Sequence, residues 1–248
     1  MPKRQYNQLR ALSITPHYLA HPEGSALIEC GDTKVICTAS IEETVPKWMS
    51  GKGRGWITAE YDMLPRATST RNQRDSHKGK INGRTQEISR LIGRSLRATA
   101  NMALLGERSI MVDCDVIQAD GGTRTASITG GYVALALAIK HLIESNKLKP
   151  EAMPAPVTAI SVGIINNEPY LDLDYELDSR AEVDMNVVMT GAGEFVEVQG
   201  TGEGHTFKRE SLDILLDLAL GALPTLIDIQ QRAIATPLSE KPLVINAK

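Results

Sequence analysis

The first half of the chain alternates between apolar and polar positions in two stretches. Residues 25–40 (SALIECGDTKVICTAS) are rich in β-branched residues on either side of Gly31-Asp32, a pair typical of a tight turn. Residues 109–118 alternate as well, with one side formed by Ile110, Val112, Cys114 and Val116. The pattern therefore predicts two strands joined by a turn in the first stretch and one strand in the second.

The second half of the chain repeats this strand pattern. The predicted strands are residues 158–165, 170–174, 181–190 and 194–200. Residues 166–169 (NNEP) form a turn between the first two of these strands. Gly191-Ala192-Gly193 separates the last two, which indicates a hairpin.

Helical periodicity occurs in three other stretches. In residues 85–100 the apolar positions at helical spacing are Ile88, Leu91, Ile92 and Leu96. Residues 125–145 are apolar on most faces, which predicts a buried helix. Residues 208–223 form an amphipathic pattern, and we expect Pro224 to begin a further helix.

The predicted strands and helices occur in blocks rather than in strict alternation. This order favours an α+β fold. The 248 residues contain no solenoid repeat, low-complexity segment or clear linker, which favours a single domain over residues 1–248. We expect residues 1–8 and 236–248 to be peripheral or frayed.

Composition excludes several classes of protein. With 42% hydrophobic and 23% charged residues, the chain is neither disordered nor collagen-like. Its three cysteines fit neither a disulfide framework nor zinc spacing, so we expect Cys30, Cys37 and Cys114 to be reduced core residues. The longest apolar stretch, residues 132–139, is far shorter than the roughly 20 residues that span a membrane. The first eight residues are polar and lack the apolar core of a signal peptide. We therefore expect a cytoplasmic protein without a membrane partner.

The charge distribution is more informative than the net charge of -3. Residues 47–97 contain 12 Lys or Arg and 4 Asp or Glu, whereas residues 150–248 contain 16 acids and 6 bases. A basic middle region in a nearly neutral protein suggests an anionic partner. The alternative is two solvated faces of opposite charge.

Two basic elements lie in this middle region. Residues 66–84 lack apolar periodicity and predict a long loop, which is usually functional or disordered. In the predicted helix that follows, one stripe is formed by Arg90, Arg94 and Arg97. Such a stripe is either a solvated face or, after a basic loop, a phosphate-binding surface.

A glycine-rich turn, residues 120–125 (DGGTRT), connects a predicted strand to the predicted buried helix. Glycines let the backbone approach an anion closely, and the free N–H groups at a helix start are directed at it. Thr123 adds a hydroxyl group, and Arg124 adds a guanidinium that binds phosphate bidentately. Arg84, just before another predicted helix, could contact the same anion. The alternative is an ordinary turn, and the Walker A pattern is absent.

Two carboxylates in the second half form another candidate site. Strand alternation places Asp184 on the polar face of its strand, and Asp178 precedes that strand and could fold back beside it. Two carboxylates held close together repel each other unless a cation joins them. Mg²⁺ bound by few carboxylates, waters and substrate phosphate oxygens fits this set. The alternative is an exposed acidic hairpin.

Five stretches of the sequence resemble the bacterial ribonuclease PH family. They are GDTKVICTAS (31–40), GWITAEYDMLPRAT (55–68), GRTQEISRLIGRSLRA (83–98), DCDVIQADGGTRTASITG (113–130) and AEVDMNVVMTGAGEFVEVQGTGE (181–203). The resemblance extends from about Leu9 to Leu223. The sequence departs from the family in a slightly short N-terminus and in the tail after Thr236, neither of which includes these motifs.

The resemblance implies a fold, an assembly and a set of site residues. The implied fold is α+β of the ribosomal protein S5 domain 2 type, assembled as a homo-oligomeric, hexameric ring of dimers. The residues implied to bind inorganic phosphate, the co-substrate, are Arg84, Gly122, Thr123 and Arg124. The residues implied to be catalytic and to bind Mg²⁺ are Asp178 and Asp184. The residues implied to bind RNA are Arg66, Arg71 and Arg74.

The activity that the resemblance implies is phosphorolysis of RNA. Bound phosphate attacks the last phosphodiester at the 3′ end of a tRNA precursor or another structured RNA and releases a nucleoside 5′-diphosphate. The reverse reaction adds nucleotides from diphosphates, as a tRNA nucleotidyltransferase does. One alternative is a non-catalytic, RNA-binding ring subunit, although the intact residue set argues against it. A second is a hydrolytic exonuclease, which usually needs a denser carboxylate cluster.

Overall fold

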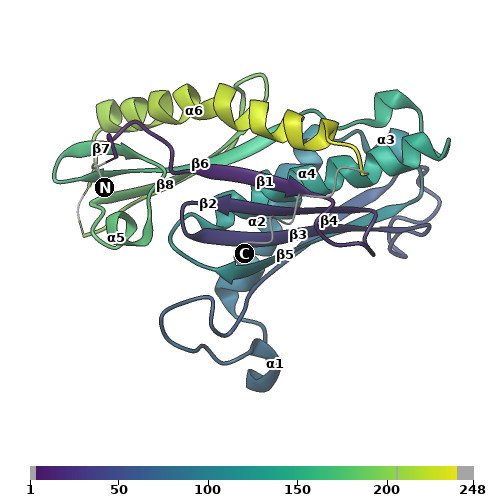
Figure 1. The fold of residues 1–248 in the computed structure, drawn as a ribbon, viewed down its shortest axis with the longest axis horizontal. Coiled ribbons are helices and arrows are strands. Elements are labelled where there is room, and N and C mark those ends of the chain that lie inside the picture. Colours follow the sequence, from purple (N-terminus) through teal and green to yellow (C-terminus); the bar gives the residue numbers. More distant parts are fainter. Residues whose placement is uncertain (1–3, 205, 239–248) are drawn as a thin grey trace, which may run out of the picture.

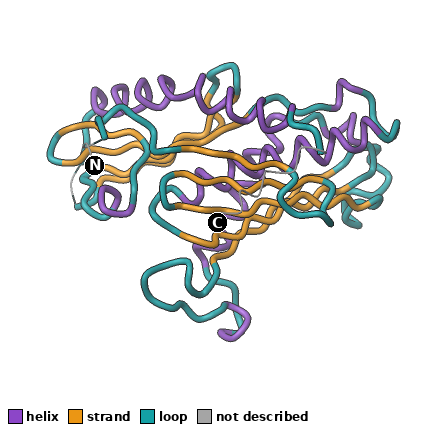
Figure 2. Tube along the Cα trace, in the orientation of Figure 1, coloured by secondary structure: helices purple, strands orange, loops and turns teal. Residues whose placement is uncertain are grey.

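The computed structural model describes residues 4–204 and 206–238 (Figure 1). The predicted frayed ends lie partly outside this range, because residues 1–3 and 239–248 are not described. Two sheets lie side by side, and three long helices pack against them (Figure 2). The α+β prediction is confirmed, since all strand pairs but one are antiparallel in the described residues.

The first sheet has five strands in the order β1-β2-β3-β5-β4. They are β1 (Leu12–Pro16), β2 (Gly24–Cys30), β3 (Thr33–Glu42), β4 (Trp56–Met63) and β5 (Ser109–Gln118). The predicted turn at Gly31-Asp32 is confirmed, since β2 and β3 pair as a hairpin up to Cys30 and Thr33. Strand β4 alone runs parallel to its neighbour β5. The strands β1 and β4 were not predicted from the hydrophobic pattern.

The second sheet has four antiparallel strands in the order β7-β6-β8-β9. They are β6 (Val157–Ile165), β7 (Glu168–Leu171), β8 (Val183–Thr190) and β9 (Phe195–Gly202). All four predicted strands are present. Strand β7 ends at Leu171, three residues earlier than predicted, and the chain then turns into the short helix α5 (Tyr175–Asp178).

Three long helices pack against the two sheets. They are α2 (Gly83–Thr99), α4 (Thr123–Glu144) and α6 (Arg209–Ala235), and the short helices are α1 (Asp75–Lys78), α3 (Met102–Leu105) and the 3₁₀ turn η1 (Pro150–Ala152). Helix α2 packs against β4, and α6 packs against β6, β7 and β1. Helix α4 packs against β2 and β3 of one sheet and against β6 of the other. It therefore connects the two sheets, and the second sheet forms a further core with α6. The single domain over residues 1–248 stays a prediction.

Helix α4 is long and apolar enough to cross a membrane by length and composition, but 83% of the residues in its most apolar window are buried inside the fold. Buried core helices of this kind show the same hydropathy. The side chains of this helix pack against the first sheet, and the three cysteines lie in the same core or beside it. All three are free and buried, as predicted.

Helix α6 differs from its prediction. We expected a second helix to begin at Pro224, but α6 continues through this proline in one 27-residue helix. A proline inside a helix removes one backbone hydrogen bond and weakens the helix. Packing on both sides offsets this cost, because Leu215 before the proline and Gln230 after it are fully buried. The Gln230 amide donates hydrogen bonds to carbonyl oxygens of α4 and β6 at 3.0 and 2.9 Å.

Candidate active site

The N-terminus of α4 lies at the end of a glycine-rich turn. Residues 120–124 are called the phosphate loop below, after the ligand that the sequence resemblance implies for them. Gly122 is the N-cap residue and has a φ of 63°, a left-handed conformation that side chains rarely adopt. Its carbonyl accepts the first helical hydrogen bond, from the N–H of Ala126. The N–H groups that precede Ala126 in the helix have no helical partner, and they carry the positive end of the dipole of a 22-residue helix. This end of α4 is therefore suited to bind an anion.

Thr123 connects this helix start to β4. Its hydroxyl group lies 2.9 Å from the hydroxyl group of Tyr61, and both residues are buried. Burial raises the pKa of Tyr61, while the positive charges of Arg84 and Arg124 lower it. Both guanidinium groups are therefore close enough to act on the same buried hydroxyl, as an anion site built from two helices requires.

Arg84 is the second residue of α2. The side chain of Asn82 caps this helix and accepts a hydrogen bond from the backbone N–H of Arg84 at 3.0 Å. The Arg84 side chain is exposed, and its charge lowers the pKa of both Asp178 and Asp184. The structure thus brings the starts of α2 and α4 together. Binding of one anion by both stays a prediction.

The predicted acidic pair is also brought together. Asp178 is the last residue of α5, and Asp184 lies in β8, half-buried. Burial and the neighbouring charge of Asp178 raise the pKa of Asp184 to about 6, although Arg124 lowers it. Asp178 is exposed, but partial loss of solvent around its carboxylate likewise raises its pKa, against the effect of Arg84 and Arg124. The negative charge of Glu203 also raises the pKa of both carboxylates, and no motif in the sequence had indicated Glu203 as part of the site.

This electrostatic environment fits a divalent cation. The two carboxylates repel each other. A cation between them would offset both this repulsion and the cost of removing their charges from solvent. Among residues 4–204 and 206–238, no group of three or more His, Cys, Asp or Glu could hold a metal ion. A pair of carboxylates is nevertheless the donor set of a Mg²⁺ that keeps several waters and takes further ligands from substrate phosphates.

Arg124 is oriented by two residues that the sequence analysis missed. Its guanidinium donates to the side-chain oxygen of Gln199 at 3.0 Å and lies 3.5 Å from the Glu87 carboxylate. The Gln199 amide in turn donates to Glu87 and to Glu197. These contacts join β9, α2 and α4, which are far apart in the sequence, so no local pattern could reveal them.

The arginine stripe of α2 is used within the fold. Arg94 forms a bidentate ion pair with Glu197, with the shortest contact at 2.7 Å. Arg97 donates to the carbonyl oxygen of Ile57 at 2.8 Å and lies over the ring of Trp56. Neither side chain forms the freely solvated or phosphate-binding stripe considered from the sequence. Arg90 remains exposed.

The residues between β4 and α2, 64–82, form the basic segment. This segment projects from the body of the molecule, with the short helix α1 at its tip (Figures 1 and 2). The predicted RNA-binding side chains are all exposed on it: Arg66, Arg71 and Arg74. One end is anchored beside the phosphate loop, because the carbonyl of the buried Ala67 accepts a hydrogen bond from the N–H of Ala119 at 2.8 Å.

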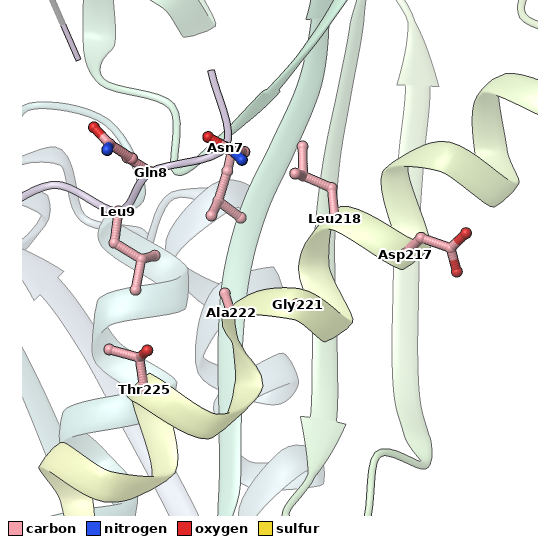
Figure 3. A pocket seen from close by; sticks show the side chains of 9 residues that line it. Asn7, Gln8, Leu9, Asp217, Leu218, Gly221, Ala222 and Thr225 are labelled. Carbon is pink, nitrogen blue, oxygen red and sulfur yellow. The ribbon is translucent and has the colours of Figure 1, made fainter. Parts of the chain in front are cut away.

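A separate cleft of about 470 Å³ lies between the N-terminal segment and α6 (Figure 3). Asn7, Gln8 and Leu9 line one side, and residues 217–225 of α6 line the other. None of the predicted site residues lines this cleft. The candidate active site is instead the open surface where α2, α4, α5 and β8 meet.

Comparison with known proteins places these features in one family. The sequence profiles of the 3′ exoribonuclease family match residues 8–140 with its domain 1 and residues 155–222 with its domain 2. The chain belongs to the 3′ exoribonuclease family. The family's first domain contains the first sheet and most of α4, and its second domain begins just before β6. Helix α4 packs against both, and the second sheet also forms a core of its own with α6.

The chain is similar to family members named ribonuclease PH. It is 58% identical to ribonuclease PH of Mycobacterium leprae (strain Br4923) over 232 residues, which cover 93% of this chain and 90% of that protein. It is 57% identical to ribonuclease PH of Bacillus cereus (strain AH820), over 93% of this chain and 95% of that protein. The predicted resemblance to this branch of the family is therefore confirmed.

Solved structures of more distant proteins share the fold. Rrp46 of rice (Oryza sativa) superimposes with a TM-score of 0.75 at 18% identity, over 93% of this chain and 98% of that chain. A chain of the Archaeoglobus fulgidus exosome, solved with RNA bound to the active site, gives 0.74 at 20% identity, over 91% and 90% of the two chains. The expected ribonuclease PH-type fold of the ribosomal protein S5 domain 2 class is confirmed.

Proposed function

We propose that this chain removes nucleotides one at a time from the 3′ ends of tRNA precursors, with inorganic phosphate as the attacking group. The chain is a phosphorolytic 3′-to-5′ exoribonuclease of the ribonuclease PH type. The proposal is supported by the proximity of positive and negative groups at one site. Arg84, Arg124 and the N-terminus of α4 lie close to the carboxylates of Asp178 and Asp184. An anion site beside a carboxylate pair is what phosphate-driven cleavage of a phosphodiester requires.

Phosphate is its own nucleophile, so the protein mainly positions it and balances charge. The free N–H groups of the phosphate loop, the Thr123 hydroxyl and the two guanidinium groups would hold it. An oxygen of phosphate forms a bond to the terminal phosphorus, and the bond from phosphorus to the 3′ oxygen of the preceding nucleotide breaks. The proton carried by hydrogen phosphate ends on that 3′ oxygen. The products are a nucleoside 5′-diphosphate and an RNA shorter by one nucleotide, and the same steps in reverse extend an RNA.

Asp178 and Asp184 would hold Mg²⁺, which would supply positive charge beside the phosphodiester under attack. The raised pKa of Asp184, about 6, supports this assignment, because such a carboxylate gains most from a nearby cation. The positive charge of Arg124 already partly offsets the negative charge of Asp178 and Asp184.

The exposed arginines of the basic segment would bind the RNA backbone. Arg66, Arg71 and Arg74 lie on a projecting segment and are free to follow a phosphate chain. Contacts of this kind are largely independent of sequence and sensitive to salt. The tRNA precursors and other structured RNAs are the substrates we propose, with the cytoplasm as location.

The assembly we propose is a homo-oligomer, a hexameric ring of dimers. The solved structures that share the fold support oligomerisation, since two of them are chains of exosome complexes. Analytical ultracentrifugation of the purified protein tests this proposal directly. A monomer at micromolar concentration would contradict it.

The decisive experiment uses a 3′-tailed tRNA, Mg²⁺ and a series of phosphate concentrations, with identification of the released mononucleotide. We expect nucleoside diphosphate, released at a rate that depends on phosphate. Nucleoside monophosphate released without phosphate would instead indicate hydrolysis. Bound but uncleaved RNA would indicate a non-catalytic ring subunit, which the complete residue set argues against.

A further inference from the structure

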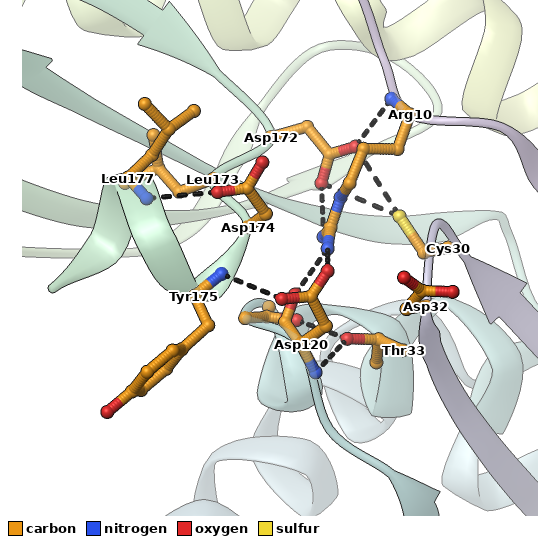
Figure 4. Close-up of polar contacts among 12 residues, drawn as sticks. Arg10, Cys30, Asp32, Thr33, Asp120, Asp172, Leu173, Asp174, Tyr175 and Leu177 are labelled. Atoms are coloured by element: carbon orange, nitrogen blue, oxygen red, sulfur yellow. Dashed lines mark hydrogen bonds and ion pairs between the residues drawn. The ribbon is translucent and has the colours of Figure 1, made fainter. Parts of the chain in front are cut away.

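A buried ion pair connects the N-terminal segment to the chain between β7 and α5 (Figure 4). One guanidinium nitrogen of Arg10 donates to Asp172 Oδ1 at 2.7 Å, and the backbone N–H of Arg10 donates to Oδ2 at 2.8 Å. The side chains of Arg10 and Asp172 are only 7% and 1% exposed. The thiol of Cys30 donates to the same carboxylate at 3.4 Å. Neither charged residue belongs to the site described above.

This pair costs folding energy that simple packing would avoid. Apolar side chains of similar volume often replace a buried ion pair without loss of stability. Asp172 also has a φ of 56°, in the left-handed region that non-glycine residues rarely adopt. Burial alone would raise the pKa of Asp172, but the hydrogen bonds and charge of Arg10 lower it, so the pair stays charged. Strained and costly arrangements of this kind are typical of functional positions.

One side of the pair holds the phosphate loop. The other terminal nitrogen of Arg10 donates to the backbone carbonyl of Asp120. A Cβ atom at Gly122 would lie 3.0 Å from the Arg10 guanidinium, so the loop backbone packs directly on it. The hydroxyl group of Thr33 completes the support, since it donates to the Gly121 carbonyl at 2.6 Å and accepts from the N–H of Asp120 at 2.8 Å.

The other side of the pair holds the helix that carries Asp178. Asp172 begins the short segment that leads into α5, and its backbone N–H donates to the Ser161 carbonyl at 2.7 Å. Asp174 caps α5 by accepting from the N–H of Leu177 at 2.9 Å. The segment is joined to the phosphate loop directly, because the N–H of Tyr175 donates to the Asp120 carboxylate at 3.2 Å.

We infer that Arg10 and Asp172 are positioning residues, which fix the phosphate loop relative to the carboxylate pair through Asp120 and α5. The inference rests on the proposed phosphate site. Misplacing a bound reactant by about 1 Å can reduce a rate by about 10²-fold, so a support of this kind has a measurable effect without touching phosphate. Its loss should weaken phosphate binding and leave the binding of RNA unchanged, because the basic segment makes no contact with the pair in the described residues.

The test compares three variants in the phosphorolysis assay. Asp172→Asn suits the left-handed backbone and removes the charge, and Arg10→Met removes the guanidinium. We expect each to raise the KM for phosphate about tenfold, with less than a twofold change in the KM for RNA. Arg10→Lys keeps the charge but cannot reach Asp172 and the Asp120 carbonyl together, so we expect partial rescue. Inorganic phosphate should raise the Tm of the wild type most, that of Arg10→Lys less, and those of Arg10→Met and Asp172→Asn least.

Gln230→Leu is the matched control. Gln230 is a fully buried polar residue that ties α6 to α4 and β6, and it makes no contact with the phosphate loop in the described residues. It should lower Tm without changing the KM for phosphate. If Arg10→Met and Asp172→Asn also lower Tm but leave that KM unchanged, the pair is only structural and the inference is wrong.

A double variant tests the inference even if the single variants fail to fold. Arg10→Met combined with Asp172→Asn removes both charges of the buried pair, and the partners that it takes from Arg4 and Asp120 belong to side chains that are 22% and 33% exposed. It should therefore recover much of the Tm of the wild type but not its KM for phosphate. Recovery of both values contradicts the positioning role. The proposed function fails separately, since it is then the wild type that shows no phosphate-dependent release of diphosphate.

Discussion

The phosphate loop and the basic segment are both expected to bind phosphate groups, yet they are built in opposite ways. The phosphate loop packs against Arg10 and Thr33 and begins a core helix. The basic segment projects from the molecule, and its arginines are exposed. Its hydrogen bonds are mostly internal, such as those that Asn72 forms with Pro65 and Thr68.

This difference corresponds to two different tasks. The reacting phosphate must be held at a fixed distance from the scissile bond, which requires groups that do not move. An RNA backbone varies in shape, and exposed arginines on a projecting segment can adapt to it. Fixed geometry should therefore determine the rate, and the adaptable segment should determine RNA affinity. Substitutions in each region test this division.

The largest effect is expected for Asp184→Asn. Removing one carboxylate of the pair should reduce kcat on the order of 10³-fold, because Mg²⁺ supplies several kcal/mol of charge stabilisation in such sites. The same change removes a half-buried charge that Asp178 repels, so metal-free protein should become more stable at pH 8 by about 1 kcal/mol. Activity assays and denaturant unfolding measure the two effects. A variant that is both inactive and less stable would argue against the electrostatic description of the pair.

Arg124→Ala should follow, with a loss of about 10²-fold in kcat/KM for phosphate. Binding of RNA, measured without phosphate, should stay the same. The matched control is Arg90→Ala on the exposed face of α2, which should change neither value. Equal losses in both arginine variants would mean that general positive charge, and not a defined anion site, controls the rate.

The effect of pH on activity at limiting Mg²⁺ should be smaller than the effects of these two substitutions, at about tenfold between pH 5 and pH 7. The pKa of Asp184 lies at about 6 in the metal-free protein, above its ordinary value of 3.8. The ionised carboxylate needed for Mg²⁺ therefore forms as pH rises through 6, and activity at limiting Mg²⁺ should rise with it. Stability follows the opposite direction: the folded protein binds the extra proton, so stability without metal is lost as pH rises through about 6. A flat profile of Mg²⁺ affinity between pH 5 and pH 7 would contradict this.

The smallest effect is expected for Arg71→Ala. Loss of one phosphate contact should weaken RNA binding about threefold and reduce the slope of log K against log salt by about one. The KM for phosphate should not change, because this exposed side chain belongs to the projecting segment. An altered KM for phosphate together with an unchanged salt slope would reverse the roles assigned to the two regions.

The sequence predicted those parts of the structure that depend on local patterns. The hairpin of β2 and β3, strand β5 and the second sheet follow from strand-like patterns bounded by turn residues, and the core helix α4 follows from a long stretch that is apolar on most faces. Strand β1 was missed because it lies at an edge of the first sheet and has no fully buried residue. Strand β4 was missed although its residues alternate between buried and more exposed positions from Ile57 to Asp62. Pro224 misled the prediction because packing further along α6 outweighs the local cost of a proline.

The candidate site divides in the same way. Gly122, Thr123 and Arg124 were candidates because they form a glycine-rich turn before a helix, and their role stays a prediction. The supports of this site were not, since Gln199 lies 75 residues from Arg124 and Asp172 lies 162 residues from Arg10. Contacts across such separations leave no periodic pattern in a single sequence. Only the packing of the two sheets around α4 brings these residues together.

Helix α4 also links ligand binding to the slowest motions of the protein. We expect its backbone amides to be among the slowest to exchange with solvent, because it contacts β2, β3 and β6. A ligand at its N-terminus that binds only the folded state adds about 2.7 kcal/mol of stability at 100 times its Kd. Phosphate should therefore slow hydrogen exchange far along this helix and into both sheets. The occupancy of one small anion site would then be reported by amides throughout the core.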